Sequence, residues 1–190
     1  MPETESTCTV IIPTLDNPNF LVPCVNSILM HTVARENIRI LVINNGNREI
    51  ENFLTKHELV KIIHAGKNLG WEGGLKLGLE HSTSEFVCFM NDDTFVPYAS
   101  NQWAIRCLSE FRNKNVAAVG PTSNVVRGMQ NVFFDQFAGH ASPYAPFLIG
   151  FCLFVRRSDL DLAGGVDETL PGGDDFDLSI RLRKLGKKLV

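Results

Sequence analysis

The sequence predicts an α/β fold, with a mostly parallel central sheet and helices on both faces. Two observations support this prediction. Strand-like and helix-like hydrophobic patterns alternate from residue 9 to residue 119, and short apolar runs end in turn-forming residues such as Pro13 or Asn44-Asn45-Gly46. In a β–α–β order the connections cross over the sheet, which places successive strands parallel.

Short apolar runs mark the strands, and apolar residues at helical spacing mark the helices. The first helix shows the spacing clearly, with Leu21, Cys24 and Val25 at positions i, i+3 and i+4. Residues 121–146 are rich in Ser, Asn, Gly and Pro, and they predict a long loop of the kind that is usually functional. The expected strands are 9–12, 38–43, 60–64, 86–90, 116–119 and 148–155, and the expected helices include 21–29, 49–57, 71–79, 98–112 and a last one that begins near Asp175.

The size and charge of the chain indicate one globular domain over residues 1–190. Apolar residues make up 44% and charged residues 21%, which is ordinary for a soluble globular protein. The net charge of -3 gives no reason to expect nucleic acid as a partner. The sequence ends at Leu189-Val190 in what looks like the middle of a strand, which leaves open that the chain is a domain cut from a longer protein.

The cysteines and the N-terminal stretch bear on the compartment. Five cysteines are scattered without a CxxC pair, which favours a reducing compartment over a disulfide framework. The first residues, MPETESTC, are acidic and polar, unlike a signal peptide. The longest apolar run, 147–155, is about half as long as a membrane span. We therefore expect a cytoplasmic protein, and peripheral contact with the inner face of a membrane stays open.

Four polar clusters fall at the ends of predicted strands or in the loops after them. They are Pro13-Thr14-Leu15-Asp16, Asn44-Asn45-Gly46, Asn68-Leu69-Gly70 and Asn91-Asp92-Asp93. The carboxyl ends of parallel strands lie on one edge of a sheet, so these clusters should converge on one crevice. Polar turns are common at this edge in any α/β protein, so the convergence alone favours a ligand site only modestly.

Two of the clusters have two interpretations each. Asp92 and Asp93 directly follow an apolar strand, where adjacent carboxylates favour a divalent cation but could equally cap the next helix. The glycine-rich stretch 68–74 lacks the GxGxxG spacing of a dinucleotide site. Its glycines would let backbone approach a ligand, with an anion at the helix N-terminus, or would serve only a tight loop.

A second acidic cluster, Gly172 to Asp177, lies at the start of the last predicted helix. Its carboxylates either stabilise the helix N-terminus or accept a proton from a substrate hydroxyl. The basic residues further along this helix are interpreted as a solvated face, and His140 is the one histidine of interest. The basic residues are Arg181, Arg183, Lys184, Lys187 and Lys188.

Taken together, the motifs resemble the family-2 glycosyltransferases, nucleotide-diphospho-sugar transferases with the Rossmann-like GT-A fold. The resemblance covers nearly the whole chain and follows the family's motif order. The similar segments are TVIIPTLDN at 9–17, VINNG at 42–46, NLGWEGGLKLGL at 68–79, FMNDDT at 89–94, a variant loop at 119–130, an acceptor-side strand and loop at 150–170, and GGDDFDLSIRLRKLG at 172–186.

The resemblance implies a nucleotide-diphospho-sugar donor, Mg²⁺ or Mn²⁺ on its phosphates, and a saccharide, lipid-linked or protein acceptor. Asp93 would be the direct metal ligand, and Asp92 would contact the ribose, a metal-bound water or the metal. Asp175 would be the general base of a single in-line displacement with inversion, and Asp174 is the alternative base. The donor-binding residues implied are Pro13, Thr14, Asp16, Asn44, Asn45, Gly46, Asn68, Gly70, Asn91, Asp92 and Asp93.

Two departures from the family pattern bear on this function. Asn44 stands where many members carry an aspartate that recognises the base, and Leu75 replaces a common asparagine. Two other functions remain open: a nucleotide-sugar-binding module without turnover, and a sugar nucleotidyltransferase. The latter would normally need a basic, glycine-rich loop after the first strand, and residues 13–19 contain no Lys or Arg.

Overall fold

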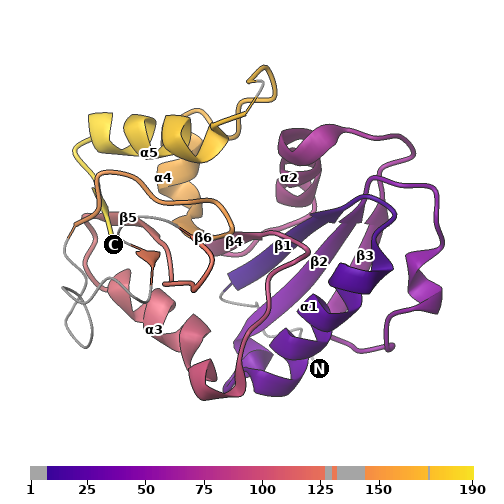
Figure 1. Ribbon diagram of the computed structural model, residues 1–190. Helices are drawn as coiled ribbons and strands as arrows, with labels where there is room; N and C mark the ends of the chain where they lie inside the picture. The colour runs from indigo at the N-terminus through magenta and orange to yellow at the C-terminus, as the bar shows by residue number, and fades with distance from the viewer. Residues whose placement is uncertain (1–7, 127–129, 132–143, 171) are drawn as a thin grey trace.

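The computed structural model describes residues 8–126, 130–131, 144–170 and 172–190. Seven strands form one sheet in the order β3-β2-β1-β4-β6-β5-β7, with helices on both faces (Figure 1). The predicted α/β architecture is therefore confirmed. The strands are β1 (Cys8–Thr14), β2 (Ile38–Asn44), β3 (Val60–His64), β4 (Phe86–Met90), β5 (Val116–Val119), β6 (Cys152–Arg156) and β7 (Lys188–Leu189).

Strand β1 lies at the centre of the parallel part of the sheet. It pairs in parallel with β2 on one side and with β4 on the other, and β2 pairs in parallel with β3. Every residue of β1 and of β4 is buried, as expected for strands covered on both faces. Among the strands that the structure describes, only β6 breaks the pattern, because it runs antiparallel to both β4 and β5.

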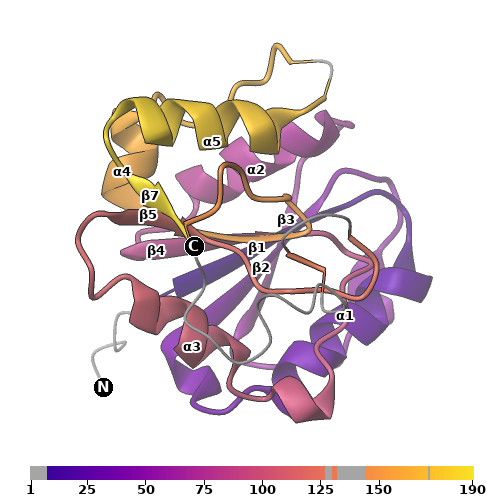
Figure 2. The ribbon, with the colours of Figure 1, turned by 60° about the vertical axis from the view of Figure 1, so that its left-hand side comes forward.

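The helices divide between the two faces, which the two views show from different sides (Figures 1 and 2). Apolar residues of α1 (Pro18–His31) and α3 (Trp103–Glu110) pack in one core cluster. Those of α2 (Gly70–Glu80), α4 (Arg157–Leu162) and α5 (Asp174–Lys184) pack in the other. Alternate residues of β1 serve the two cores, Val10 the first and Ile11 the second.

Several predicted elements differ from the observed ones. The helix expected at 49–57 is only a 3₁₀ turn, η2 (Ile50–Asn52), since few side chains of 49–57 are apolar and only Ile50 and Leu54 of them lie in the core. The strand expected at 148–155 begins at Cys152, and the helix expected at 98–112 is a 3₁₀ turn, η3 (Tyr98–Ser100), followed by α3.

The remaining observations concern two short helical elements, the last residues and the predicted long loop. The short helix α4 and the 3₁₀ turn η1 (Arg35–Asn37) were not expected. The last residues do form a strand, β7, which pairs in parallel with β5. Much of the predicted 121–146 loop, including 127–129, 132–143 and therefore His140, lies outside the described residues. Among the helices that the structure describes, none is long and apolar enough to cross a membrane.

Helix α2 approaches the sheet closely through Gly78. Gly78 is buried, and a Cβ there would collide with the Ile11 side chain of β1. Interiors are close-packed, so the helix could accommodate a side chain only by moving away from the sheet. Because α2 begins at the site edge described below, this contact also positions its N-terminus.

Gly78→Val should therefore destabilise the fold. We expect the free energy of unfolding to fall by about 2–3 kcal/mol, from overpacking against Ile11. Urea denaturation followed by circular dichroism measures it. Glu80→Ala, at an exposed position of the same helix, should change it by under about 0.5 kcal/mol, and an equal effect of the two variants would contradict the packing argument.

Candidate active site

The loops after β1 and β2 interlock at the carboxyl edge of the sheet. The backbone N–H of Asn45 donates to the Thr14 carbonyl at 2.9 Å, and that of Arg48 donates to Asp16 Oδ1 at 2.8 Å. Asp16 adopts a left-handed backbone conformation, with φ of 51°. A Cβ at Gly46 would collide with the Asp16 carboxylate, so glycine is needed at this point. The two loops therefore form one continuous rim.

Asn44 is fully buried, and its amide is used within this rim. Its Oδ1 accepts from the Gly46 N–H at 3.0 Å, and its Nδ2 donates to the Arg48 carbonyl at 2.8 Å. Nδ2 also lies 3.2 Å from Nδ1 of His64, whose other ring nitrogen pairs with Glu51. Asn44 thus shapes the turn, and its direct contact with a ligand stays a prediction.

Asn45, by contrast, has one polar atom without a partner. Its Nδ2 donates to the Gly70 carbonyl at 2.8 Å, while its Oδ1 is buried and makes no hydrogen bond. The Gly70 carbonyl fixes this orientation, because a flipped amide would face it with an oxygen. A Cβ at Gly74 would lie 2.9 Å from Pro13 Cβ, so α2 packs directly on this corner. A buried, unpaired acceptor suggests a ligand that donates a hydrogen bond here.

The remaining predicted residues of the glycine-rich loop lie at the surface. Asn68 is exposed, and its Oδ1 accepts from the Gly70 N–H at 2.9 Å. This short-range hydrogen bond shapes the start of α2. Gly70 has a φ of 74°, a left-handed conformation that glycine adopts without strain. The loop therefore presents backbone at the rim, next to Asn45.

The first acidic pair stands at the end of β4, beside the end of β1. Thr14 Oγ1 donates to Asp92 Oδ2 at 2.6 Å, and Asp93 is exposed. Burial raises the pKa of the Asp92 carboxyl, the Thr14 hydrogen bond lowers it, and the Asp93 charge raises it. The helix-capping interpretation is wrong, because the next helical turn begins only at Tyr98 and has Pro97 at its N-cap.

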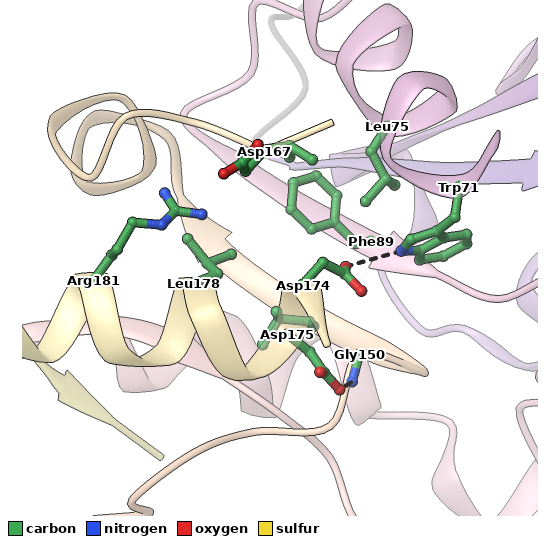
Figure 3. A pocket seen from close by; sticks show the side chains of 11 residues that line it. Trp71, Leu75, Phe89, Gly150, Asp167, Asp174, Asp175, Leu178 and Arg181 are labelled. Carbon is green, nitrogen blue, oxygen red and sulfur yellow. Dashed lines mark hydrogen bonds between the residues drawn. The ribbon is translucent and has the colours of Figure 1, made fainter. Parts of the chain in front are cut away.

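The second acidic pair opens α5, and its two carboxylates face different neighbours (Figure 3). Asp174 Oδ2 accepts from Trp71 Nε1 at 3.0 Å. Asp175 Oδ2 accepts from the Gly150 N–H at 2.9 Å, and its Oδ1 accepts from the Phe176 N–H at 2.8 Å. Asp174 therefore faces α2, whereas Asp175 faces the loop that precedes β6.

This loop connects the two acidic pairs. The Phe151 carbonyl accepts from the Asn91 N–H at 3.0 Å and from Thr94 Oγ1 at 3.1 Å. Asn91 immediately precedes the first pair, and Gly150, which contacts Asp175, immediately precedes Phe151. Two clusters that are 82 residues apart in sequence thus meet through one short loop.

A narrow pocket lies between α2 and α5. Its volume is about 10 Å³, room for about one water molecule, so no sugar fits there in this conformation. Its polar lining residues are Asp167, Asp174, Asp175 and Arg181, and its apolar ones are Trp71, Leu75, Phe89, Leu153, Val166 and Leu178 (Figure 3).

The basic residues of α5 are not simply a solvated face. Arg181 pairs with Asp177 at 2.6 Å and donates to the carbonyls of Ala163 and Gly165. Lys187 pairs at 2.7 Å with Asp159, which is buried. Arg181 and Lys187 therefore bind α5 and the start of β7 to the segment 159–165. For these two residues the prediction of a solvated face was wrong.

The described residues bring together most of the predicted set. Contacts link Pro13, Thr14, Asp16, Asn45, Gly46 and Gly70 around the rim, and they link Thr14 to Asp92. Prediction from sequence missed Trp71, Thr94 and Gly150 as neighbours of the acids. In the part of the chain described, no three His, Cys, Asp or Glu side chains form a ready metal cage.

Comparison with solved structures defines the class of the fold. A mannosyltransferase of Pyrobaculum calidifontis, PcManGT, solved with GDP-Man and Mn²⁺, matches 100% of this chain and 55% of its own, with a TM-score of 0.77 and 18% identity. GalNAc-T7, solved with UDP, GalNAc and Mn²⁺, matches 98% of this chain and 42% of its own, with a TM-score of 0.75 and 14% identity. The fold is that of the GT-A glycosyltransferases.

The sequence comparison is more specific, since the profile of glycosyl transferase family 2 matches residues 9–161. This chain belongs to glycosyl transferase family 2. A pre-mycofactocin glycosyltransferase of Mycobacterium tuberculosis is 27% identical over 198 residues, which cover 95% of this chain and 40% of that protein. The O-antigen biosynthesis protein RfbC of Myxococcus xanthus is 24% identical over 95% of this chain and 16% of that protein. The chain thus spans less than half the length of these relatives.

The environment of Asp174 predicts how stability depends on pH. Burial raises the pKa of this carboxyl above its ordinary value of 3.8, and this outweighs the lowering by the Trp71 hydrogen bond. A raised folded-state pKa means that the folded protein favours the protonated acid. The associated stability is fully present below the unfolded pKa and is lost as pH rises through the folded pKa.

Asp174→Asn removes a charge that burial disfavours, so it should raise the melting temperature at pH 7. The gain should be only about 1–2 °C, because solvent partly screens a half-buried charge. Asparagine can still accept the Trp71 hydrogen bond. The gain should shrink as pH falls toward 4. Differential scanning fluorimetry across pH measures it, with Glu80→Gln as an exposed control, and a gain that grows at low pH would refute the assignment.

Proposed function

We propose that this chain is the catalytic domain of an inverting, metal-dependent glycosyltransferase. It would move a sugar from a nucleotide-diphospho-sugar to an acceptor hydroxyl. The observation that carries the proposal is the loop 150–151, which links Asp175 to the residues flanking Asp92 and Asp93. A proton acceptor and a cation-binding pair are thereby held beside one sheet edge, which is what transfer from a diphosphate donor requires.

The rim formed after β1 and β2 is the proposed donor site. Asp16 and the backbone at Gly46 and Gly70 line it, and the unpaired Oδ1 of Asn45 needs a hydrogen-bond donor such as a base N–H or a ribose hydroxyl. Solved proteins with this fold were crystallised with GDP-Man or UDP. The fully engaged amide of Asn44 supports an indirect role for that residue, through the shape of the turn.

The acidic pair fits a hard divalent cation. Asp93 is exposed, and Asp92 is held by Thr14 beside it, where the repulsion between the two acids would be relieved by a positive charge. Mg²⁺ or Mn²⁺, held by Asp93 and Asp92 together with the donor's phosphates, would offset the charge that develops on the leaving diphosphate. Mn²⁺ accompanies the ligands in both solved relatives of the fold.

Asp175 is the proposed general base. Two backbone N–H groups hold its carboxylate in one orientation, and its oxygens keep lone pairs for a further proton donor. Asp175 would take the proton of the acceptor hydroxyl as that oxygen bonds to the anomeric carbon. The bond from the anomeric carbon to the diphosphate oxygen breaks, and its electron pair leaves with the nucleoside diphosphate. A single displacement of this kind inverts the anomeric configuration.

For the acceptor we propose the three classes that the sequence predicts, a saccharide, a lipid-linked acceptor or a protein. Asp174, held by Trp71, is the alternative base, and both Asp174 and Asp175 line the narrow pocket. Location in the cytoplasm, with or without peripheral contact at a membrane, also remains a prediction. A nucleotide-sugar-binding module without turnover and a sugar nucleotidyltransferase are separated from the proposed function by the two experiments that follow.

The first experiment concerns the donor and the metal. UDP-, GDP-, dTDP- and CMP-sugars are compared in a thermal-shift assay with and without Mn²⁺. One nucleotide class at 100 times its Kd should stabilise the chain by about 2.7 kcal/mol, and EDTA should remove most of this effect. Asp93→Asn should also remove it, whereas Glu80→Gln should not. Stabilisation unchanged by EDTA and by Asp93→Asn would contradict the metal role.

The second experiment concerns the base. Asp175→Asn should lower kcat for transfer by about 10²- to 10⁴-fold, the usual contribution of a positioned base, and leave donor binding within about twofold. Release of nucleoside diphosphate measures turnover, and NMR of the product gives its anomeric configuration. Donor binding without turnover in the unmodified chain would favour a binding module. Formation of a nucleotide-sugar from a sugar phosphate would favour the nucleotidyltransferase, and a retained configuration would contradict the single displacement.

A further inference from the structure

The loop before β6 is held by three consecutive backbone N–H groups, each of which donates to a side-chain oxygen. The three hydrogen bonds are Leu148 N–H to Ser179 Oγ at 3.1 Å, Ile149 N–H to Gln130 Oε1 at 2.6 Å, and Gly150 N–H to Asp175 Oδ2 at 2.9 Å. The three residues lie outside the strands of the sheet, so these side chains supply their partners. The position of the loop therefore depends on them.

Gln130 is the partner that comes from outside α5. Its side chain is only 6% exposed. Its Oε1 accepts from Ile149, and its Nε2 donates to the Pro121 carbonyl at 3.1 Å. Because one neighbour is a donor and the other an acceptor, the amide has a single satisfied orientation. Removing it leaves the Ile149 N–H and the Pro121 carbonyl without these partners.

The hydrogen bond of Gln130 acts next to the base candidate. The Ile149 N–H that binds Gln130 belongs to the Leu148–Ile149 peptide, and the Gly150 N–H that binds Asp175 belongs to the next peptide along the chain. The approach is close, since a Cβ at Gly150 would lie 3.2 Å from Asp175 Cβ. A shift of the 149–150 peptide would consequently move or break the hydrogen bond that orients the Asp175 carboxylate.

The same loop also holds the first acidic pair, through the hydrogen bonds of the Phe151 carbonyl to Asn91 and Thr94. The segment 149–151 thus touches Gln130, the base candidate and the acid-bearing loop in succession. The distance between Asp175 and the Asp92–Asp93 pair depends on where this segment lies.

We propose that Gln130 is a positioning residue for the transfer reaction. It fixes the Leu148–Ile149 peptide, and through the adjoining Ile149–Gly150 peptide it orients Asp175 relative to the first acidic pair. The inference rests on the proposed role of Asp175 as base. Gln130 is the last residue of the variant loop 119–130 noted in the sequence. The proposed donor, metal and base residues include none from this loop.

The structural part is tested without substrate, by ¹H–¹⁵N NMR of the whole chain. Gln130→Met keeps the length of the side chain but removes its acceptor, so the amide signals of both Ile149 and Gly150 should move. Asp175→Ala should move the Gly150 signal as well. Gln130→Glu restores the acceptor for Ile149 but not the donor for the Pro121 carbonyl, so it should return both signals only part of the way to their original positions. Gln102→Met, at an exposed glutamine, is the matched control and should move neither.

The catalytic part is tested by hydrolysis of the donor that the thermal-shift panel selects, with Mn²⁺ and water as the acceptor. Gln130→Met should lower kcat about 10- to 100-fold with KM for the donor within twofold, as expected for a displaced base. Gln130→Glu, which restores only the acceptor for Ile149, should recover part of the rate. A Gly150 signal unmoved in Gln130→Met, or a loss in KM instead of kcat, overturns the role of Gln130. An unmodified chain without turnover, or Asp175→Asn with full turnover, instead overturns the proposed function.

Discussion

The parallel pairing of β1 with β2 and β4 is the constraint on which the site depends. The register places Thr14 opposite Asn44, and the pairing with β4 brings Asp92 within 2.6 Å of Thr14. A hydrogen bond to a carboxylate is roughly twice as strong as one between neutral groups, and it holds a half-buried acid whose burial disfavours its charge. A shift of one residue in register would turn Thr14 toward the opposite face and remove this link.

The other half of the site has a different origin. Strand β6 runs antiparallel, so the loop that enters it, 148–151, lies at the same edge as the ends of β1, β2 and β4. Side chains of α5 and Gln130 hold that loop, and Asp175 belongs to both groups of contacts. We thus propose donor and metal binding at the ends of the parallel strands, and proton removal at the start of α5. The loop 150–151 joins the two parts.

Much of the fold could be predicted from the sequence because burial on both faces produces continuous apolar runs, as in Phe86 to Met90. The convergence of the polar clusters followed from parallel topology alone. The direction of β6 could not be read, since an apolar strand has the same composition whichever way it runs. The partners of the 148–150 amides were also hidden, because they are side chains 19 to 31 residues away. Periodicity describes an element, whereas these hydrogen bonds depend on how elements are placed in space.

The central claim is that the donor, the cation and Asp175 meet at one edge of the sheet. Paramagnetic broadening by Mn²⁺, bound together with the selected nucleotide-sugar, tests it most directly. The amide signals of residues 14–16, 45–46, 91–94 and 150–151 and of Asp175 should broaden first, while those near Cys8 and Ile38 at the opposite edge persist. Broadening centred on the opposite edge, or broadening of 91–94 that leaves Asp175 and Gly150 unaffected, would contradict it.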